Sequence, residues 1–374
     1  MKDLISAFLL IFLLNPNPGV AQATSTNPTP GRLEGTTAFL HESATPAKAT
    51  KTHPAWFRGT GANGLADANA KYFYHELIGP GVPPPAFQNN FLYFGSLEMK
   101  AGYTYPAHNH PAAEFYYILD GEADWYVDDE VEHVKPGSLI YHRPNAVHGW
   151  TVTGDKPLKV VWGWWSDTDP SLLNTSAKMV NPDLAGEQET AKPFAVPLPK
   201  RKPGTTAFLD GNATPAKATK THPAWFRGTG ANGLADANAK YFYHELIGPG
   251  VPPPAFQNNF LYFGSLEMKA GYTYPAHNHP ASEFYYVVDG EADWYVDDEA
   301  QHVTPGSLIY HRPYAVHGWT VTGNKPLKVV WGWWSETDPS VLNASAKMVN
   351  PDLASKQETA LPKAVPVPAV RRRP

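Results

Sequence analysis

The stretch YPAHNHPAAEFYYILDG at residues 105–121 returns almost unchanged as YPAHNHPASEFYYVVDG at residues 274–290. The sequence around it is duplicated as well, and matching residues such as His108 and His277 lie 169 positions apart. A repeat of this length is too long for a solenoid unit and fits a whole small domain. We therefore expect two copies of one domain, at residues 35–190 and 204–360.

Each copy reads as a series of short strands separated by turns. Segments such as 122–127 and 158–165 are rich in aromatic and β-branched residues, and Gly, Pro or Asp separates most of them. This pattern predicts an all-β barrel or sandwich in each copy. The segment 64–77 has the composition of a helix, and we expect a minor helical extension outside the barrel there.

Alternation along the strands predicts which side chains face the interior. Lys159 and Asp124 should face water, which turns Trp125, Trp162 and Trp164 inward, with Trp294, Trp331 and Trp333 in the second copy. The same parity gives His108 and His110 a common face, and likewise Glu114 and Tyr116. Each barrel should therefore receive two imidazoles, a carboxylate and a phenol.

Composition excludes several classes of function. The net charge is −5 and only 17% of the 374 residues are charged, so the chain offers no basic surface for nucleic acid. It contains no cysteine, so thiolate chemistry and disulfides are absent. The Pro- and Lys-rich segment 191–203 reads as a linker, and the Pro- and Arg-rich segment 361–374 as an extended tail.

The N-terminal residues have the pattern of an export signal. Lys2 precedes an apolar run at residues 4–14, and Ala21-Gln22-Ala23 offers the small residues that signal peptidase accepts. We expect residues 1–23 to be a signal peptide cleaved after Ala23, and the mature protein to be periplasmic or secreted. The apolar run is too short to anchor the mature chain in a membrane.

The repeated histidine segment resembles the first motif of the cupin superfamily. The pattern Gly102-x5-His108-x-His110-x3-Glu114-x6-Gly121 matches it throughout, and Gly137-x5-Arg143-x-Asn145-x2-His148 is similar to the second motif. The second copy carries His277, His279, Glu283 and His317, with Tyr314 in place of Asn145. Tyrosine suits a tight turn less well than asparagine does, so the shape of that loop is open. The resemblance implies two tandem jelly-roll barrels, a bicupin.

Three imidazoles and one carboxylate form a ligand set that suits Fe, Mn, Zn, Ni or Cu. Such a cluster is costly to bury without a cation. We therefore expect one divalent transition metal per cupin domain. The histidines that stand alone read as core residues with satisfied hydrogen bonds, namely His53, His75, His133 and His142.

A narrower resemblance concerns the cupin-type dimethylsulfoniopropionate (DMSP) lyases. Tyr105 lies five residues before His110, Tyr116 lies two after Glu114, and His148 follows His110 by 38 residues. The resemblance implies cleavage of DMSP to dimethyl sulfide and acrylate, with Tyr105 and Tyr274 as bases and Tyr116 and Tyr285 as substrate-binding residues. The substrate is a zwitterion, and the inward tryptophans offer aromatic faces to its sulfonium group.

Two alternatives stay open. The chain could be another metal-dependent bicupin enzyme, similar to oxalate decarboxylases or dioxygenases. It could also be an exported bicupin that binds or stores a ligand without catalysis. Whether the chain forms a homo-oligomer is likewise open.

Overall fold

The computed structural model describes both copies and leaves parts of the chain undescribed. The described residues are 37–49, 65–80, 82, 87, 89–166, 169–175, 177–180, 206–218, 234–249, 251, 256, 258–335, 338–344 and 346–349. The predicted signal peptide, linker and tail lie outside them. The domain boundaries given above accordingly stay predictions.

The first copy contributes eleven strands and two short 3-10 helices. They are β1 (Phe39–His41), η1 (Glu42–Ala44), β2 (Tyr72–Ile78), β3 (Leu92–Met99), β4 (Thr104–Asn109), β5 (Ala113–Asp120), β6 (Glu122–Val127), β7 (Glu130–Val134), β8 (Ser138–His142), β9 (His148–Thr153), β10 (Leu158–Trp165), η3 (Pro170–Asn174) and β11 (Lys178–Met179).

The second copy repeats the same order of elements. They are β12 (Phe208–Asp210), η5 (Gly211–Ala213), β13 (Tyr241–Ile247), β14 (Leu261–Met268), β15 (Thr273–Asn278), β16 (Ser282–Asp289), β17 (Glu291–Val296), β18 (Glu299–Val303), β19 (Ser307–His311), β20 (His317–Thr322), β21 (Leu327–Trp334), η7 (Pro339–Asn343) and β22 (Lys347–Met348).

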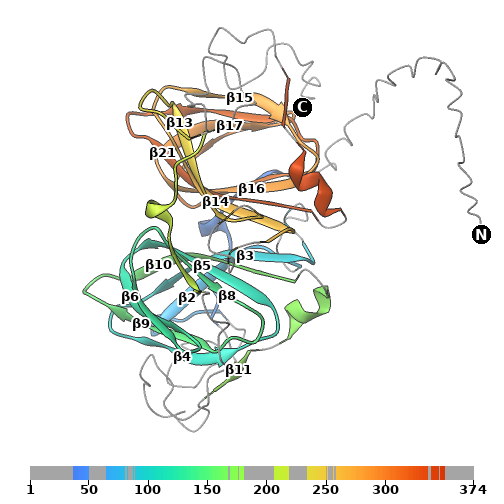
Figure 1. Cartoon of the computed structure of the whole chain (residues 1–374). Coiled ribbons are helices and arrows are strands. Elements are labelled where there is room, and N and C mark those ends of the chain that lie inside the picture. The colour runs from blue at the N-terminus through green and yellow to red at the C-terminus, as the bar shows by residue number, and fades with distance from the viewer. Residues whose placement is uncertain are drawn as a thin grey trace, which may run out of the picture. The chain divides into compact units, whose positions relative to one another are not determined.

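Each barrel consists of a six-stranded and a five-stranded antiparallel sheet (Figure 1). In the first barrel the strand orders are β12-β8-β5-β10-β3-β2 and β11-β4-β9-β6-β7. The second barrel has the equivalent orders β1-β19-β16-β21-β14-β13 and β18-β17-β20-β15-β22. The two predicted jelly-roll barrels are confirmed, and strands expected at 122–127, 138–142 and 158–165 have those bounds.

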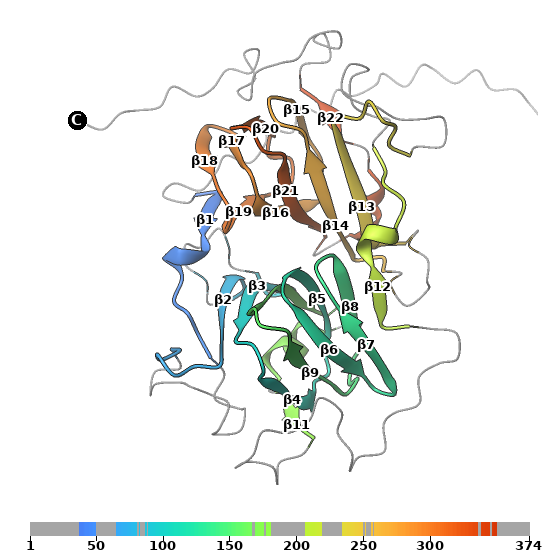
Figure 2. The ribbon, with the colours of Figure 1, turned by 90° about the vertical axis from the view of Figure 1, so that its left-hand side faces the viewer.

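The two copies exchange their first strands (Figure 2). Strand β1 of the first copy pairs with β19 of the second barrel, and β12 of the second copy pairs with β8 of the first barrel. Phe39 faces Ile309 in one pairing and Phe208 faces Ile140 in the other. Each barrel is therefore completed by a strand from the other copy.

The six-stranded sheets pack against each other through an apolar core. Phe94 contacts Phe284, and Phe115 contacts Phe263, with ring centroids 4.2 Å apart in both pairs. Both faces of these sheets are therefore buried, one inside a barrel and one between barrels. This explains the nearly continuous apolar sequence of β10, where Val161 and Trp165 belong to the core between the barrels.

The prediction of a helix at 64–77 is wrong for those residues of the segment that the structure describes. Residues 72–78 form strand β2, which pairs with β3, and Tyr72, Leu77 and Ile78 are buried. Pairing with β3 and burial of these side chains outweigh the local helical composition. Only short 3-10 helices occur among the described residues, and none is long and apolar enough to cross a membrane.

Candidate metal centres and their cavities

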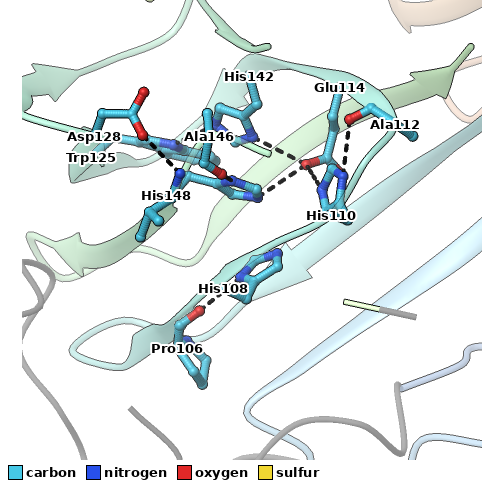
Figure 3. A network of polar contacts seen from close by, with 11 residues as sticks. Pro106, His108, His110, Ala112, Glu114, Trp125, Asp128, His142, Ala146 and His148 are labelled. Atoms are coloured by element: carbon cyan, nitrogen blue, oxygen red, sulfur yellow. Dashed lines mark hydrogen bonds and ion pairs between the residues drawn. The ribbon is translucent and has the colours of Figure 1, made fainter. Parts of the chain in front are cut away.

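Strands from both sheets of the first barrel bring its predicted ligands together (Figure 3). His108 on β4 lies opposite His148 on β9, while Glu114 stands at the start of β5. Candidate ligand atoms of His108, His110 and His148 all lie within 4.8 Å of one another, and all three residues are buried. The cupin motifs are thus joined in space although 38 residues separate His110 from His148.

Backbone carbonyls orient the three imidazoles. Each Nδ1 lies 2.8 to 3.1 Å from a carbonyl oxygen two residues away, that of Pro106, Ala112 or Ala146. A carbonyl only accepts hydrogen bonds, so each Nδ1 carries the proton and each Nε2 presents a lone pair. This is the tautomer that a metal ligand requires.

The Nε2 atoms of His110 and His148 lie beside a carboxylate. Glu114 Oε2 lies 3.1 Å from His110 Nε2 and 3.3 Å from His148 Nε2. His148 Nε2 is buried and has no hydrogen-bond partner. Lone pairs facing an anionic oxygen repel one another unless a cation lies among them. The donor set and the unsatisfied nitrogen therefore fit a divalent metal held by His108, His110, Glu114 and His148.

The protonation states agree with this interpretation. Burial lowers the pKa of His148 to about 3 and that of His108 well below its ordinary value, so both rings are neutral near pH 7. Burial by itself would raise the pKa of Glu114, but His110 and the hydrogen bonds around the carboxylate hold it well below its usual range. The site therefore presents the neutral imidazoles of His108 and His148 beside one negative charge.

His142 lies within ligand distance of Glu114 and His148, but both of its ring nitrogens are engaged in hydrogen bonds. The Trp125 indole N–H donates to His142 Nε2 at 3.1 Å, so the proton of this ring is on Nδ1, which donates to Glu114 Oε2 at 3.1 Å. The ring also stacks on His148, with centroids 3.7 Å apart. Interpreting His142 as a buried, hydrogen-bonded residue was right, but its contact with Glu114 was missed.

The other histidines that stand alone have different surroundings. His75 Nδ1 lies 3.0 Å from the hydroxyl of Thr45. His133 is on the surface rather than in the core, beside Asp124 at 2.8 Å. His53 lies outside the described residues.

The second barrel repeats the centre with little change. His279 Nε2 lies 3.0 Å from Glu283 Oε2, and His317 Nε2 is again buried without a hydrogen-bond partner. Tyr314 has φ 65°, close to the φ 63° of Asn145. Its N–H donates to the His279 carbonyl at 2.7 Å, as that of Asn145 does to the His110 carbonyl at 2.8 Å. The loop shape left open by the sequence is therefore the same in both copies.

A cavity of about 330 Å³ opens onto each centre. In the first barrel its walls include Tyr105, Tyr116, Trp162 and Trp164, beside His108, His110 and Glu114. The second cavity has the equivalent walls Tyr274, Tyr285, Trp331 and Trp333. Trp164 also stacks on the His110 ring, with centroids 4.4 Å apart. The predicted base, the carboxylate-binding tyrosine and two of the three tryptophans thus surround one space.

Trp125 and Trp294 lie outside the cavity walls, and each donates to a histidine instead. Conversely, the cavity includes residues that strand parity within the motif did not indicate, namely Tyr74, Glu76, Tyr93, Leu97, Leu173, Asn174, Thr175 and Ala177. Most come from β2, β3 and η3, which the sequence analysis placed outside the site or left unassigned. Strand β3 pairs with β10 and β2 pairs with β3, and these tertiary contacts give no local signal in the sequence.

The protein groups around Tyr105 and Tyr116 keep both side chains as neutral phenols. Burial raises the pKa of Tyr105 well above its ordinary value, and the neighbouring Tyr72 and Glu114 add to the effect. Burial and the Glu114 charge raise the pKa of Tyr116 in the same direction. Tyr105 stacks on Trp150, with centroids 4.0 Å apart, and this contact fixes its ring.

Comparison with known proteins finds the same motifs. The cupin domain family model matches twice, at residues 95–164 and 264–333. A dimethylsulfoniopropionate lyase of Ruegeria pomeroyi is 33% identical over 111 residues, which cover 29% of this chain and 53% of the relative. The chain thus spans about half the length of this curated relative.

Solved structures share the two-barrel arrangement. An oxalate decarboxylase of Lactobacillus farciminis in complex with formate has a TM-score of 0.57 at 13% identity, covering 86% of this chain and 91% of the other. A mutant of a Bacillus subtilis oxalate decarboxylase has a TM-score of 0.55 at 14% identity, covering 85% and 81%. At these identities the likeness concerns the fold alone.

Proposed function

Because this chain is a tandem cupin protein that resembles DMSP lyases, we propose that each barrel is a metal-dependent lyase that cleaves DMSP to dimethyl sulfide and acrylate. The observation that carries the proposal is the cavity beside each metal centre. Each cavity measures about 330 Å³ and is lined by metal-ligand side chains, two phenols and two indole rings. The partial likeness to the Ruegeria pomeroyi lyase supports the same reaction.

The cavity suits both ends of a sulfonium carboxylate. Faces of Trp162 and Trp164 offer cation–π contacts for the dimethylsulfonium, worth about 1–2 kcal/mol when desolvated. Glu76 adds a negative charge to the same walls, although its Oε2 is paired with Lys48 Nζ at 2.9 Å. The carboxylate end would lie toward His108, His110 and Tyr116.

A divalent cation held by the three histidines and Glu114 would supply positive charge that favours an ionised phenol nearby and the charge developing at the substrate α-carbon. Within the chain, Tyr105 is the proposed base that removes the α-proton. The electrons of that C–H bond form the double bond of acrylate. The C–S bond breaks with its electron pair on sulfur, so dimethyl sulfide leaves neutral and needs no acid.

Tyr116 has a different proposed task. Glu114 lies near enough to raise the pKa of the Tyr116 hydroxyl, and the ring packs 5.0 Å from Trp125 and 5.1 Å from Trp150, measured between centroids. A phenol fixed in this way can orient a substrate carboxylate beside the metal ligands. The equivalent residues in the second barrel are Tyr274 as base and Tyr285 as orienting group.

The relay from Trp125 through His142 holds Glu114 in place. Because His142 Nδ1 donates to the carboxylate, Glu114 keeps its position and its negative charge. The equivalent relay in the second barrel runs from Trp294 through His311 to Glu283. With the export signal predicted at residues 1–23, we further propose that the lyase acts outside the cytoplasm.

Proton NMR of the products tests the proposed reaction. Metal-loaded full-length protein is incubated with DMSP in one tube and with oxalate in another. We expect acrylate and dimethyl sulfide in equal amounts from DMSP, and no formate from oxalate. Formate from oxalate together with unchanged DMSP would assign the protein to the oxalate decarboxylase type instead.

A further inference from the structure

The loop between β8 and β9, residues 143–147, leads into the candidate ligand His148 and is fixed at two points. The Asn145 N–H donates to the carbonyl of His110, a second candidate ligand, at 2.8 Å. Both backbone polar groups of Val147 are bonded to Asp128, the residue directly after β6 (Figure 3). Asp128 has no task in the reaction proposed above.

The bonds between Asp128 and Val147 are reciprocal. The Asp128 N–H donates to the Val147 carbonyl at 2.7 Å, and the Val147 N–H donates to Asp128 Oδ1 at 2.9 Å. Strands β6 and β9 pair as far as Val127 and His148. Asp128 then has φ 54°, a left-handed backbone that turns the chain away from the ladder. Its carboxylate oxygen therefore accepts the Val147 N–H in the place of a strand carbonyl.

The Asp128 carboxylate is buried, with only 1% of the side chain exposed. Burying a charge is costly unless the group is paired and hydrogen-bonded. Arg143, at the start of the same loop, donates from Nη2 to Oδ2, so both carboxylate oxygens have partners within the loop. Asp128 therefore holds the first residue of the loop and the last one at the same time.

We propose that Asp128 is a positioning residue that fixes His148 and thereby slows release of the metal from the first centre. Val147 precedes His148 directly and follows Ala146, whose carbonyl accepts the hydrogen bond from His148 Nδ1. Fixing the backbone of Val147 therefore fixes both the imidazole and the carbonyl that orients it. Loss of groups that orient metal ligands typically costs about 10- to 100-fold in metal affinity.

The second barrel has the same arrangement. The Asp297 N–H donates to the Val316 carbonyl at 2.7 Å, and the Val316 N–H donates to Asp297 Oδ1 at 2.9 Å. Arg312 Nη2 donates to Asp297 Oδ2 at 2.7 Å. Asp297 should therefore position His317 as Asp128 positions His148. A variant of one barrel thus has the unchanged barrel of the same chain as its reference.

The inference rests on the metal centres that the proposed function uses, and it does not depend on the substrate. Metal release is measured without DMSP. A protein that retains its metal but leaves DMSP intact would refute the proposed lyase reaction and leave the role of Asp128 untouched. The two failures are therefore distinguishable.

Release of cobalt(II) to a chelator tests this role. Full-length protein loaded with cobalt(II) is mixed with EDTA, and the visible absorbance of the bound cobalt is followed. Asp128→Gly removes the carboxylate, and glycine adopts the positive φ without strain. We expect half of the cobalt to leave about tenfold faster than from the parent, and the other half to leave at the parental rate. Asp297→Gly should have the same effect on the other half.

Two variants serve as controls. Asp128→Asn keeps a side-chain oxygen that can accept the Val147 N–H, so it should release both ions near the parental rate. Asp124→Ala removes a different carboxylate from β6, an exposed one that lies 2.8 Å from His133 on the surface, and should leave both rates unchanged. Equal release by Asp128→Asn and Asp128→Gly would overturn the role of the hydrogen bond to Val147.

Melting temperatures of the metal-free variants separate positioning from a purely structural role. Parental release of both ions by Asp128→Gly would overturn the proposal, and a lowered melting temperature beside it would make Asp128 a structural residue only. Faster release of both ions would overturn it too, since the second centre has its own Asp297. If Asp128→Gly does not fold, Asp128→Glu keeps the charge but displaces the carboxylate, and the same faster release of one ion is expected.

Discussion

The double replacement Tyr105→Phe with Tyr274→Phe tests the assignment of the catalytic base. It removes one hydroxyl per barrel and leaves each ring in place, because the ring of Tyr105 stacks on Trp150 at 4.0 Å and that of Tyr274 on Trp319 at 4.1 Å. The hydroxyl of Tyr105 is hydrogen-bonded to Tyr72, and its loss should cost about 1 kcal/mol of stability per barrel. The fold and the metal content should therefore persist.

The expected effect on the rate is much larger. Losing a general base costs about 10²- to 10⁴-fold, or about 3 to 5 kcal/mol of transition-state stabilisation. The loss should appear in kcat, since the metal ligands and the Trp162 and Trp164 faces that bind substrate are unchanged. The assay is steady-state release of dimethyl sulfide from DMSP by protein with matched metal content.

The pair Tyr116→Phe with Tyr285→Phe is the informative comparison. Tyr116 lines the cavity beside Glu114 and is proposed to orient the substrate carboxylate, so its loss should raise KM as well as lower kcat. If the Tyr105, Tyr274 variant keeps a kcat near that of the parent, another group is the base and the proposed mechanism is refuted.

Three further predictions concern metal content and stability. Elemental analysis should find about two divalent transition-metal ions per reconstituted chain, and one or none would contradict the two ligand sets. Tyr314→Asn should raise the free energy of unfolding by about 1 kcal/mol, because a tyrosine at φ 65° is strained and the residue, 51% exposed, loses little packing when replaced. The reverse change, Asn145→Tyr, should lower the free energy of unfolding. Denaturant titration measures both, and unchanged midpoints would refute the strain. Metal-free protein should lose stability as pH falls below about 6.5, because burial lowers the pKa of His148 and His317 to about 3 in the folded state. The unfolded chain therefore takes up protons at a higher pH than the folded chain does. A urea midpoint that stays constant from pH 7 to pH 5 would contradict this.

The sequence predicted the barrels well because strand periodicity and turns are local signals. The bounds of β6, β8 and β10 follow directly from aromatic and β-branched runs between Gly, Pro and Asp. The segment 72–78 was missed because its helical composition is local, whereas its pairing with β3 is a tertiary contact. The exchange of β1 and β12 could not be predicted either, since both barrels offer the same partner sequence.

The sequence predicted those site residues whose spacing in the cupin motifs determines where they lie in the barrel. His108, His110 and His148 meet as the cupin resemblance implied. Parity indicated that Trp125 faces inward, but it could not indicate that the indole lies behind His142 instead of in the cavity.

The central claim is that each barrel holds one metal-dependent lyase site. Initial rates of dimethyl sulfide release by the metal-loaded parent, Glu114→Ala, Glu283→Ala and the double variant test it most directly. We predict about half the parental rate in each single variant, because each leaves one complete ligand set, and no release above background in the double variant. Release by the double variant at a rate near that of the parent would contradict the claim.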